Sequence, residues 1–537
     1  MLESPSVGAD TAVTADDRAA LLVENSELRA RIEAREQRIR LLEEALRVLK
    51  ANTYGPSRER LSVAAGQVEL FNEIEATLDI TEAVGIEPEL KATPLRDEKH
   101  TGGKPGRAKL AAHLPRVEIR HELSATERQC GCGSVLVEIG ADVSEQIDYV
   151  PAKVQVLRYV RVKYACPACE QCVKTAALPE HILPKTNASP GLLAHLVTGK
   201  YVDSLPLYRQ EAVFERYGVR LPRATQAAWM IGLNLPLQPL LNLLDERVRS
   251  SGYVRIDETR VQVINSDKPP SALHWMWVRV AGPKHQRIIL FDYDPSRGGE
   301  VADGLIEGCS GYLQSDGYQA YEGVSERAGL VHVGCFAHAR RRFFEALKAL
   351  PNAQRKHASA AHEAVRRIDA LYLIERQIKD LSDEERTRIR TVEAVPQLAS
   401  LHGWAAKMQH ETMPSGKLGE ALGYLITQWP KLERYVEDPR LAIDTNLAEN
   451  AIRPFALGRR NWLFADTIKG AKASAALYSI VSTARANGLE PYAYLRGLFA
   501  DLPKAKTVED FEALLPFNFK LCCNDSQVPS GVPECGV

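Results

Sequence analysis

A chain of 537 residues is far longer than one domain, and its composition, 45% hydrophobic and 26% charged, is that of a soluble globular protein. The formal net charge of -1 excludes a uniformly basic nucleic-acid coat, although local basic patches can still bind phosphate. We expect no membrane span, because no run of about eighteen apolar residues occurs.

Residues 1–17 are small, polar and acidic, which predicts disorder. They lack the basic and apolar regions of a secretory signal. Apart from one cluster, most of the ten cysteines are scattered, as is typical of a reducing compartment. We therefore expect a cytoplasmic protein built from several modules.

Residues 18–52 carry a heptad pattern. Apolar residues recur at its two core positions: Leu21, Leu28, Ile32, Ile39, Leu42, Leu46 and Leu49. Asn25 also occupies a core position, and one buried Asn is a known means of fixing the register of a parallel dimer. The pattern predicts a leucine-zipper-like coiled coil that pairs two copies of the chain. The alternative is an amphipathic helix packed on its own protein.

Residues 53–125 read as a linker, because Gly55 and Pro56 break the preceding helix. The linker contains a basic, glycine-rich run at residues 99–109. Such a run either contacts DNA phosphates as a flexible arm or is merely solvated.

Residues 126–180 contain two close pairs of cysteines separated by β-rich sequence: Cys130, Cys132, Cys166 and Cys169. Four thiolates in two tight turns suit a tetrahedral zinc site, and we expect one structural Zn²⁺. The first pair is one residue closer than is usual. Free buried cysteines are the alternative, and Cys172 is either unliganded or an alternative fourth ligand.

Residues 185–248 are predicted to be a helical DNA-binding region. An amphipathic helix over 208–217, a turn at Gly218 and a second helix from about 221 follow the order of a helix-turn-helix. Arg223, Thr225 and Gln226 fall near the start of the second helix, where bases are read. A plain helical hairpin without a DNA role is the alternative.

Residues 250–500 change to an α/β pattern. The order of three strands, helix, strand and helix, followed by a helical insertion at about 345–435, predicts a ribonuclease H-like core. Asp257 ends the first strand, Asp316 ends the fourth, and Glu449 lies on a late helix beside a cationic run. Three carboxylates brought together can hold two divalent metals for phosphoryl transfer.

These motifs together resemble the DDE transposases of the bacterial insertion-sequence-sixty-six (IS66-type) family. The resemblance covers most of residues 20–518. It is carried by the motifs at 257–259, 315–318, 335–341, 446–454 and 457–464. The fold class it implies is a multidomain α/β protein, with a coiled coil, a zinc ribbon and a helix-turn-helix-like region before the catalytic core.

The resemblance implies a set of roles. Asp257, Asp316 and Glu449 would be the acidic triad, with two Mg²⁺ or Mn²⁺ ions. The chain would bind the terminal inverted repeats of its element, cut there and join the 3′-OH to target DNA. A homodimer or higher oligomer is expected, and accessory proteins of the same element are further candidate partners. Asn450 departs from the Arg common in similar proteins, and segment 501–537 ends in a tail predicted to be unstructured.

Several residues beside the triad have open roles. Cys335 and His338 are either half of a metal site or packing residues at a helix start. Asp444 is either the N-cap of the helix that carries Glu449 or a metal ligand. The residues expected to contact DNA phosphates, with solvated surface charge as the alternative, are Arg341, Arg453, Arg459, Arg460 and Lys472.

Two other functions compete with transposition. One is a catalytically retired, transposon-derived protein that only binds DNA, and the presence of all three acids argues against it. The other is a stand-alone ribonuclease H-like nuclease, which would need neither the dimerising N-terminus nor the zinc module.

Overall fold

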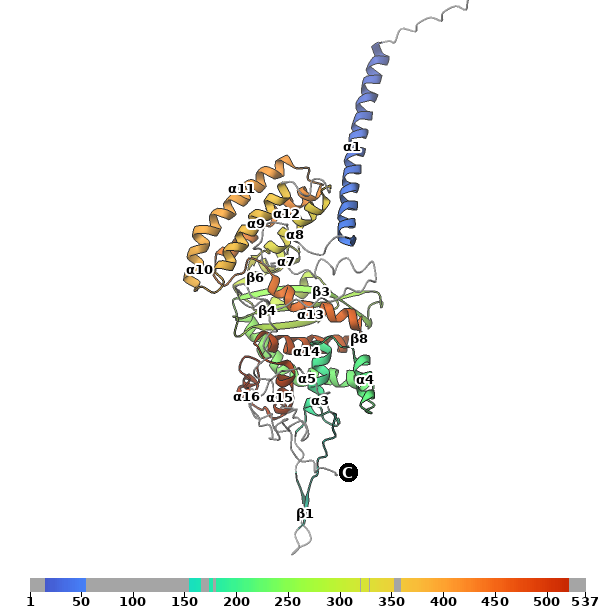
Figure 1. The fold of residues 1–537 in the computed structure, drawn as a ribbon, viewed down its shortest axis with the longest axis vertical. Coiled ribbons are helices and arrows are strands. Elements are labelled where there is room, and N and C mark those ends of the chain that lie inside the picture. The colour runs from blue at the N-terminus through green and yellow to red at the C-terminus, as the bar shows by residue number, and fades with distance from the viewer. Residues whose placement is uncertain are drawn as a thin grey trace, which may run out of the picture. The chain divides into compact units, whose positions relative to one another are not determined.

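The computed structural model describes residues 15–54, 154–165, 173–176, 180–318, 320–327, 329–351 and 359–520. It divides into two compact units, residues 85–176 and the rest of the chain. The basic linker, the four predicted zinc ligands and the end of the tail lie outside the described residues. The described part is a mixed α/β protein, as predicted (Figure 1).

The smaller unit contains an antiparallel pair of short strands, β1 (Lys163–Ala165) and β2 (Val173–Thr175). Arg161 extends the pairing, because its Nε donates to the carbonyl of Ala176 at 2.7 Å. The prediction of β structure before this hairpin is wrong for residues 154–162, which form no strand. Their apolar side chains are exposed, so no core among the described residues covers them.

The larger unit is built on a mixed sheet with strand order β5-β4-β3-β6-β7. The first three strands form an antiparallel meander, and β6 and β7 run parallel to β3. A last short strand, β8 (Ala465–Thr467), pairs in parallel with the far half of β3. The bounds are β3 Tyr253–Asn265, β4 Leu273–Ala281, β5 Ile288–Asp294, β6 Tyr312–Gln314 and β7 Val331–Val333.

Helices cover the sheet on its faces and along one edge. Helix α13 (Asn446–Trp462) packs on β3 and β4, and α14 (Ile468–Ala486) packs on β5 (Figure 1). The hydroxyls of Ser479 and Thr483 on α14 accept hydrogen bonds from backbone N–H groups of β5, at 2.7 and 3.1 Å. These contacts satisfy the outer edge of the sheet, which would otherwise offer unpaired groups to another strand. Two short helices, α6 (Gly299–Ile306) and α7 (Ala320–Arg327), lie in the connections next to β6.

A helical region separates β7 from α13 and has an apolar core of its own. Arg390 is fully buried at its π-helical turn and stabilises the region by donating to the Glu375 carboxylate and to backbone carbonyls of Tyr435, Asp438 and Leu441. Its helices are α8 Phe336–Ala349, α9 Ala360–Gln377, α10 Asp383–Ile389, η1 Arg390–Ala394, α11 Val395–Glu411, α12 Lys417–Leu432 and η2 Glu433–Val436. These elements occupy the place of the predicted insertion.

The helices before and after the sheet pack together beneath it. They are α3 Pro190–Tyr201, α4 Leu207–Arg216, α5 Arg223–Arg249, α15 Pro491–Asp501, η3 Leu502–Lys504 and α16 Val508–Ala513. Among the described residues, α5 is the one helix long and apolar enough to cross a membrane. It contains two prolines and buries Leu233, Leu237 and Leu244 completely, packing against α14 as a core helix does.

Helix α1 (Ala15–Tyr54) runs unbroken for 40 residues and so begins earlier than the predicted coiled coil. Its heptad residues from Leu28 onward are exposed, with Ile32 and Ile39 each at 56%. Near its C-terminus Arg47 Nε donates to the carbonyl of Ala349 at 2.6 Å. The heptad seam, meaning the line of these apolar heptad residues along α1, is therefore exposed, as a pairing surface would be. The coiled coil itself stays a prediction.

Candidate active site

Two of the predicted catalytic acids lie on neighbouring strands, Asp316 in the loop after β6 and Asp257 within β3. The prediction that Asp257 ends its strand is wrong, because β3 continues to Asn265 and pairs there with β4 and β8. Strands β3 and β6 are parallel neighbours, and their last pair in register is Arg255 opposite Gln314. Asp257 and Asp316 each follow two residues later. Both acids therefore follow the β3–β6 pairing at the same level of the sheet, from adjacent strands. Both acids also act electrostatically on the hydroxyl of Tyr321, which supports their proximity.

The Asp316 loop is tightly held. Its carboxylate accepts a hydrogen bond from the N–H of Tyr318 at 3.0 Å. The next residue must be glycine, because a Cβ on Gly317 would lie 2.6 Å from Tyr424 Oη. Burial raises the pKa of Asp316, and the Tyr318 N–H and three guanidinium groups, including Arg341, partly offset that effect. The loop therefore places a carboxylate among cations.

Glu258, next to Asp257, is a residue whose role sequence reasoning missed. Its side chain is 2% exposed and binds Arg297 through Nε at 2.7 Å and Nη2 at 2.6 Å. Tyr321 donates its hydroxyl to the same carboxylate. Burial raises the pKa of Glu258, and the nearby Asp316 raises it further. The Arg297 guanidinium also stacks 3.8 Å from the Tyr318 ring centroid, which links Glu258 to the Asp316 loop.

Glu449 lies in the first turn of α13, which packs on β3. Its side chain is buried, and Oε1 accepts a hydrogen bond from Thr445 Oγ1 at 3.3 Å. Arg341 Nη2 lies 3.7 Å from Oε2. Since Arg341 also partly offsets the burial that raises the pKa of Asp316, this guanidinium lies within electrostatic reach of both the second and the third acid.

Asp444 has a structural role at the start of α13. Its carboxylate accepts from the backbone N–H of Asn446 at 3.1 Å and from the Asn446 side chain at 2.7 Å. The N-cap residue itself is Thr445, one position later than predicted. The hydrogen bonds favour the capping interpretation of Asp444 over the ligand interpretation.

Cys335 and His338 lie at the start of α8, which is compatible with both the packing and the metal-site interpretation. Cys335 is the buried N-cap residue, and its Sγ accepts from Thr445 N at 3.3 Å and Oγ1 at 3.2 Å. The structure adds a third donor, because Sγ, His338 Nδ1 and a Glu449 carboxylate oxygen all lie within 4.8 Å of one another. Sequence spacing could not reveal this partner, since Glu449 comes from a distant helix.

The predicted base-reading residues lie at the start of α5. Arg223 is exposed and Thr225 is half-buried. The prediction for Gln226 is wrong, because its side chain is fully buried and its Nε2 donates to the Leu221 carbonyl at 2.9 Å. Gln226 stabilises the turn between α4 and α5 and does not face a ligand.

The predicted phosphate contacts are spread over three helices. Arg341 on α8, Arg453 and Arg459 on α13 are half-buried, while Arg460 on α13 and Lys472 on α14 are exposed. Arg459 already donates to the carbonyl of Arg260 on β3. Arg341 contacts Glu449, and the phosphate-binding role of all five cations remains a prediction.

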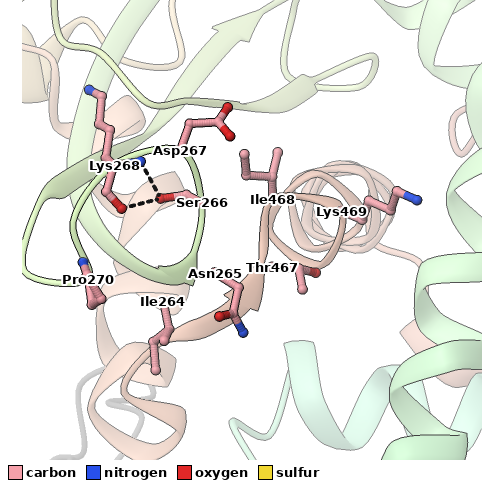
Figure 2. A pocket seen from close by; sticks show the side chains of 9 residues that line it. All are labelled: Ile264, Asn265, Ser266, Asp267, Lys268, Pro270, Thr467, Ile468 and Lys469. Atoms are coloured by element: carbon pink, nitrogen blue, oxygen red, sulfur yellow. Dashed lines mark hydrogen bonds between the residues drawn. The ribbon is translucent and has the colours of Figure 1, made fainter.

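A surface hollow of about 660 Å³ lies away from this group, at the far end of β3 and the start of α14 (Figure 2). Ser266 Oγ lies within hydrogen-bond distance of the backbone N and O of Lys268 at its rim. None of the three acids is among the residues that line it: Ile264, Asn265, Ser266, Asp267, Lys268, Pro270, Thr467, Ile468 and Lys469. The hollow is therefore distinct from the acid site.

Comparison with protein families places the chain among the transposases. The model described as Transposase IS66 family matches residues 185–473, which is more than half of the chain. The chain belongs to the IS66 family of transposases, as its motifs indicated. The zinc-finger binding domain of transposase IS66 matches 127–170, Transposase C of IS166 homeodomain matches 41–119, and the IS66 C-terminal element matches 479–517. These matches support the predicted zinc-finger and DNA-binding character.

Relatives in Sinorhizobium fredii (strain NBRC 101917 / NGR234) match the chain over most of its length. Uncharacterized protein y4qI is 31% identical over 527 residues, which is 94% of this chain and 93% of that protein. Uncharacterized protein y4hP is 30% identical, over 89% of this chain and 88% of its own. Uncharacterized protein y4jD is also 30% identical, over 76% and 81%.

Proposed function

We propose that this chain is a DDE transposase that cuts the ends of its insertion sequence and joins the freed 3′-OH to target DNA. The observation that carries the proposal is that Asp257 and Asp316 follow the β3–β6 pairing by two residues each, while Arg341 acts on both Asp316 and Glu449. The strand order β5-β4-β3-β6-β7, with an antiparallel meander and two parallel strands, supports a ribonuclease H-like catalytic core over about 250–500.

The three acids fit two divalent metals. They offer hard oxygen ligands, which Mg²⁺ and Mn²⁺ prefer. Burial raises the pKa of Asp316, so the ionised carboxylate is costly there unless cations accompany it. Asp257, Asp316 and Glu449 would hold the ions, and when bound these would activate the attacking oxygen and stabilise the leaving one.

The surrounding residues position the acids and the DNA. Glu258 fixes Arg297, and Arg297 stacks on Tyr318, so the pair restrains the loop that carries Asp316. Arg341 offsets negative charge between Asp316 and Glu449 and lies where a phosphate would enter. The remaining proposed phosphate contacts are Arg453, Arg459, Arg460 and Lys472.

DNA-end binding is assigned to the modules before the core. We assign one structural Zn²⁺ to Cys130, Cys132, Cys166 and Cys169, and DNA contacts to Arg223 and Thr225. The exposed seam of α1 would pair two copies, so that each brings one element end. Accessory proteins of the same element remain candidate partners, and the cytoplasm is the proposed location.

The test is cleavage of a labelled element end in Mg²⁺, run beside a gel shift on the same DNA. Asp257→Asn, Asp316→Asn and Glu449→Gln should each abolish cleavage and retain DNA binding. Glu326→Gln, an exposed carboxylate on α7, is the matched control and should cut normally. Binding without cleavage by the unaltered chain in either Mg²⁺ or Mn²⁺ would instead identify a catalytically retired DNA-binding protein.

A further inference from the structure

Two helix N-termini meet beside the third acid. Helix α8 begins after Cys335, and α13 begins after Thr445. The backbone joins them directly, because Phe336 N donates to the carbonyl of Ile443 at 3.1 Å. Helix N-termini favour negative charge, which offsets part of the effect of burial and of the Glu449 and Asp444 carboxylates, which raise the pKa of the Cys335 thiol.

Three different donor atoms converge at this junction. His338 Nδ1 lies 3.6 Å from Glu449 Oε1, and Cys335 Sγ lies within 4.8 Å of both. His338 Nδ1 is buried and has no hydrogen-bond partner in the described part of the chain. A buried polar atom without a partner is costly, and a ligand would remove that cost.

The sulfur already has the surroundings of a metal-bound thiolate. Thr445 donates its backbone N–H to Cys335 Sγ, and its hydroxyl shares one proton between Sγ and Glu449 Oε1. Hydrogen bonds of this kind orient a ligand and tune its charge. The two oxygens of Glu449 are also divided, with Oε1 toward His338 and Thr445 and Oε2 toward Arg341. Glu449 Oε1 can therefore bind a metal ion together with Cys335 Sγ and the His338 imidazole, while Oε2 keeps its contact with Arg341.

We propose that Cys335, His338 and Glu449 form a binding site for a soft divalent cation of the zinc class. Zinc accepts sulfur, nitrogen and oxygen ligands at about 2.0–2.3 Å, which puts neighbouring tetrahedral ligands about 3.3–3.8 Å apart. The 3.6 Å separation of His338 Nδ1 and Glu449 Oε1 falls in that range. Mg²⁺ prefers oxygen and gains little from the thiol, so the site distinguishes the two classes of metal.

A regulatory consequence rests on the proposed function. Glu449 belongs to both ligand sets, so a zinc-class ion held by Cys335 and His338 withdraws this carboxylate from the catalytic metals. Micromolar Zn²⁺ then inhibits cleavage even when Mg²⁺ is abundant. The thiol and the imidazole thus make the third acid sensitive to soft metals.

Metal binding is measured first, without any activity assay. The full chain, purified with zinc, is titrated with Co²⁺, whose bond to a thiolate absorbs in the near ultraviolet. The unaltered chain should bind one Co²⁺ more than Cys335→Ser, which keeps a hydroxyl for the Thr445 contacts. Cys309→Ser, at another buried cysteine, is the matched control and should titrate like the unaltered chain. His338→Gln, which leaves the thiol in place, should weaken the extra site at least about tenfold.

Identical titrations of the unaltered chain and both site variants would overturn the proposal. If Cys335→Ser does not fold, as judged by circular dichroism, His338→Gln alone decides between these outcomes. In the cleavage assay, Zn²⁺ should inhibit His338→Gln at least about tenfold less strongly than the unaltered chain. Equal inhibition would overturn the regulatory part, whereas an extra Co²⁺ site in a chain that never cuts DNA would leave the metal site standing and reject the proposed function.

Discussion

Arg341 Nη2 lies 3.7 Å from Glu449 Oε2, and the same guanidinium partly offsets the burial that raises the pKa of Asp316. One cation from α8 thus serves two acids that come from a strand end and from a different helix. Neutralising it should leave the fold intact but remove a positive charge from the place where a phosphate would enter.

The first prediction concerns that cation. Arg341→Gln should lower the rate of strand cleavage by about 10²-fold, because one preorganised charge at a reacting phosphate contributes on that scale. Arg366→Gln, on a side chain that is 72% exposed and paired with Glu363, is the control and should cut at the normal rate. Cleavage of Arg341→Gln within threefold of the control would show that Arg341 is not part of the site.

A second prediction tests the close packing on the Asp316 loop. Gly317→Ala should reduce cleavage more than about tenfold, because its Cβ would lie 2.6 Å from Tyr424 Oη and the loop would have to move. Adding Tyr424→Ala should restore much of the activity, since it removes the clashing ring. Gly304→Ala, whose Cβ meets nothing within 4 Å, is the control. A double variant no more active than Gly317→Ala would refute the steric explanation.

Local patterns were enough to predict the strand end just before Asp316 and the helix that carries Glu449, but not that the strand carrying Asp257 continues to Asn265. Period-two and helical patterns depend on near neighbours, so a single sequence displays them. Contacts across long separations are not displayed in that way. The pairing of Glu258 with Arg297 and the meeting of Cys335 with Glu449 depend on how the sheet and helices pack.

Gln226 is the reverse case, in which the sequence pattern suggested a functional role that the structure contradicts. Its place near the start of a second helix is typical of a base-reading residue, yet the turn before α5 leaves the Leu221 carbonyl in need of a donor. The side chain satisfies that carbonyl and is buried. Whether a polar side chain near a helix start faces outward or back toward its own turn is decided by packing, which the sequence pattern does not contain.

The third prediction is a pH-dependent stability contribution between α5 and β4. Arg279 is 4% exposed and binds Asp245 at 2.6 Å and Asp292 at 3.0 Å. Burial alone would raise the pKa of Asp245, but Arg279 and Arg249 outweigh it and lower that pKa below its usual value. Asp245→Asn should therefore lower the free energy of unfolding by roughly 1–3 kcal/mol at neutral pH.

The sign of the pH dependence follows from the lowered pKa. The stabilisation is fully present above the unfolded value of about 3.9 and is lost as the pH falls through the folded pKa. Urea unfolding should show a constant gap between the unaltered chain and Asp245→Asn from about pH 5 to 8, closing below about pH 4. Asp501→Asn, an exposed acid, is the control. A gap that widens in acid would contradict the assignment.

The fourth prediction concerns the proposed structural zinc. Metal analysis of the purified chain should find about one tightly held Zn²⁺, because closed thiolate sites bind zinc strongly and contribute folding energy. Cys166→Ser together with Cys169→Ser should remove it, while Cys172→Ser should not. Full retention of zinc by the Cys166 and Cys169 double variant would exclude this ligand set.

The last prediction concerns the exposed seam of α1. Ile39→Glu with Leu46→Glu places charges at one core position of the heptad, where the native side chains are 56% and 50% exposed. Like charges facing each other across a coiled coil destabilise the dimer, whereas the apolar contacts that they replace stabilise it. The association state should therefore fall. Glu36→Gln, off the seam, should leave it unchanged. Sedimentation measures the association state, and circular dichroism checks that the core remains folded. A double variant that sediments like the unaltered chain would show that α1 does not pair the copies, and element ends would then have to be bridged through another surface.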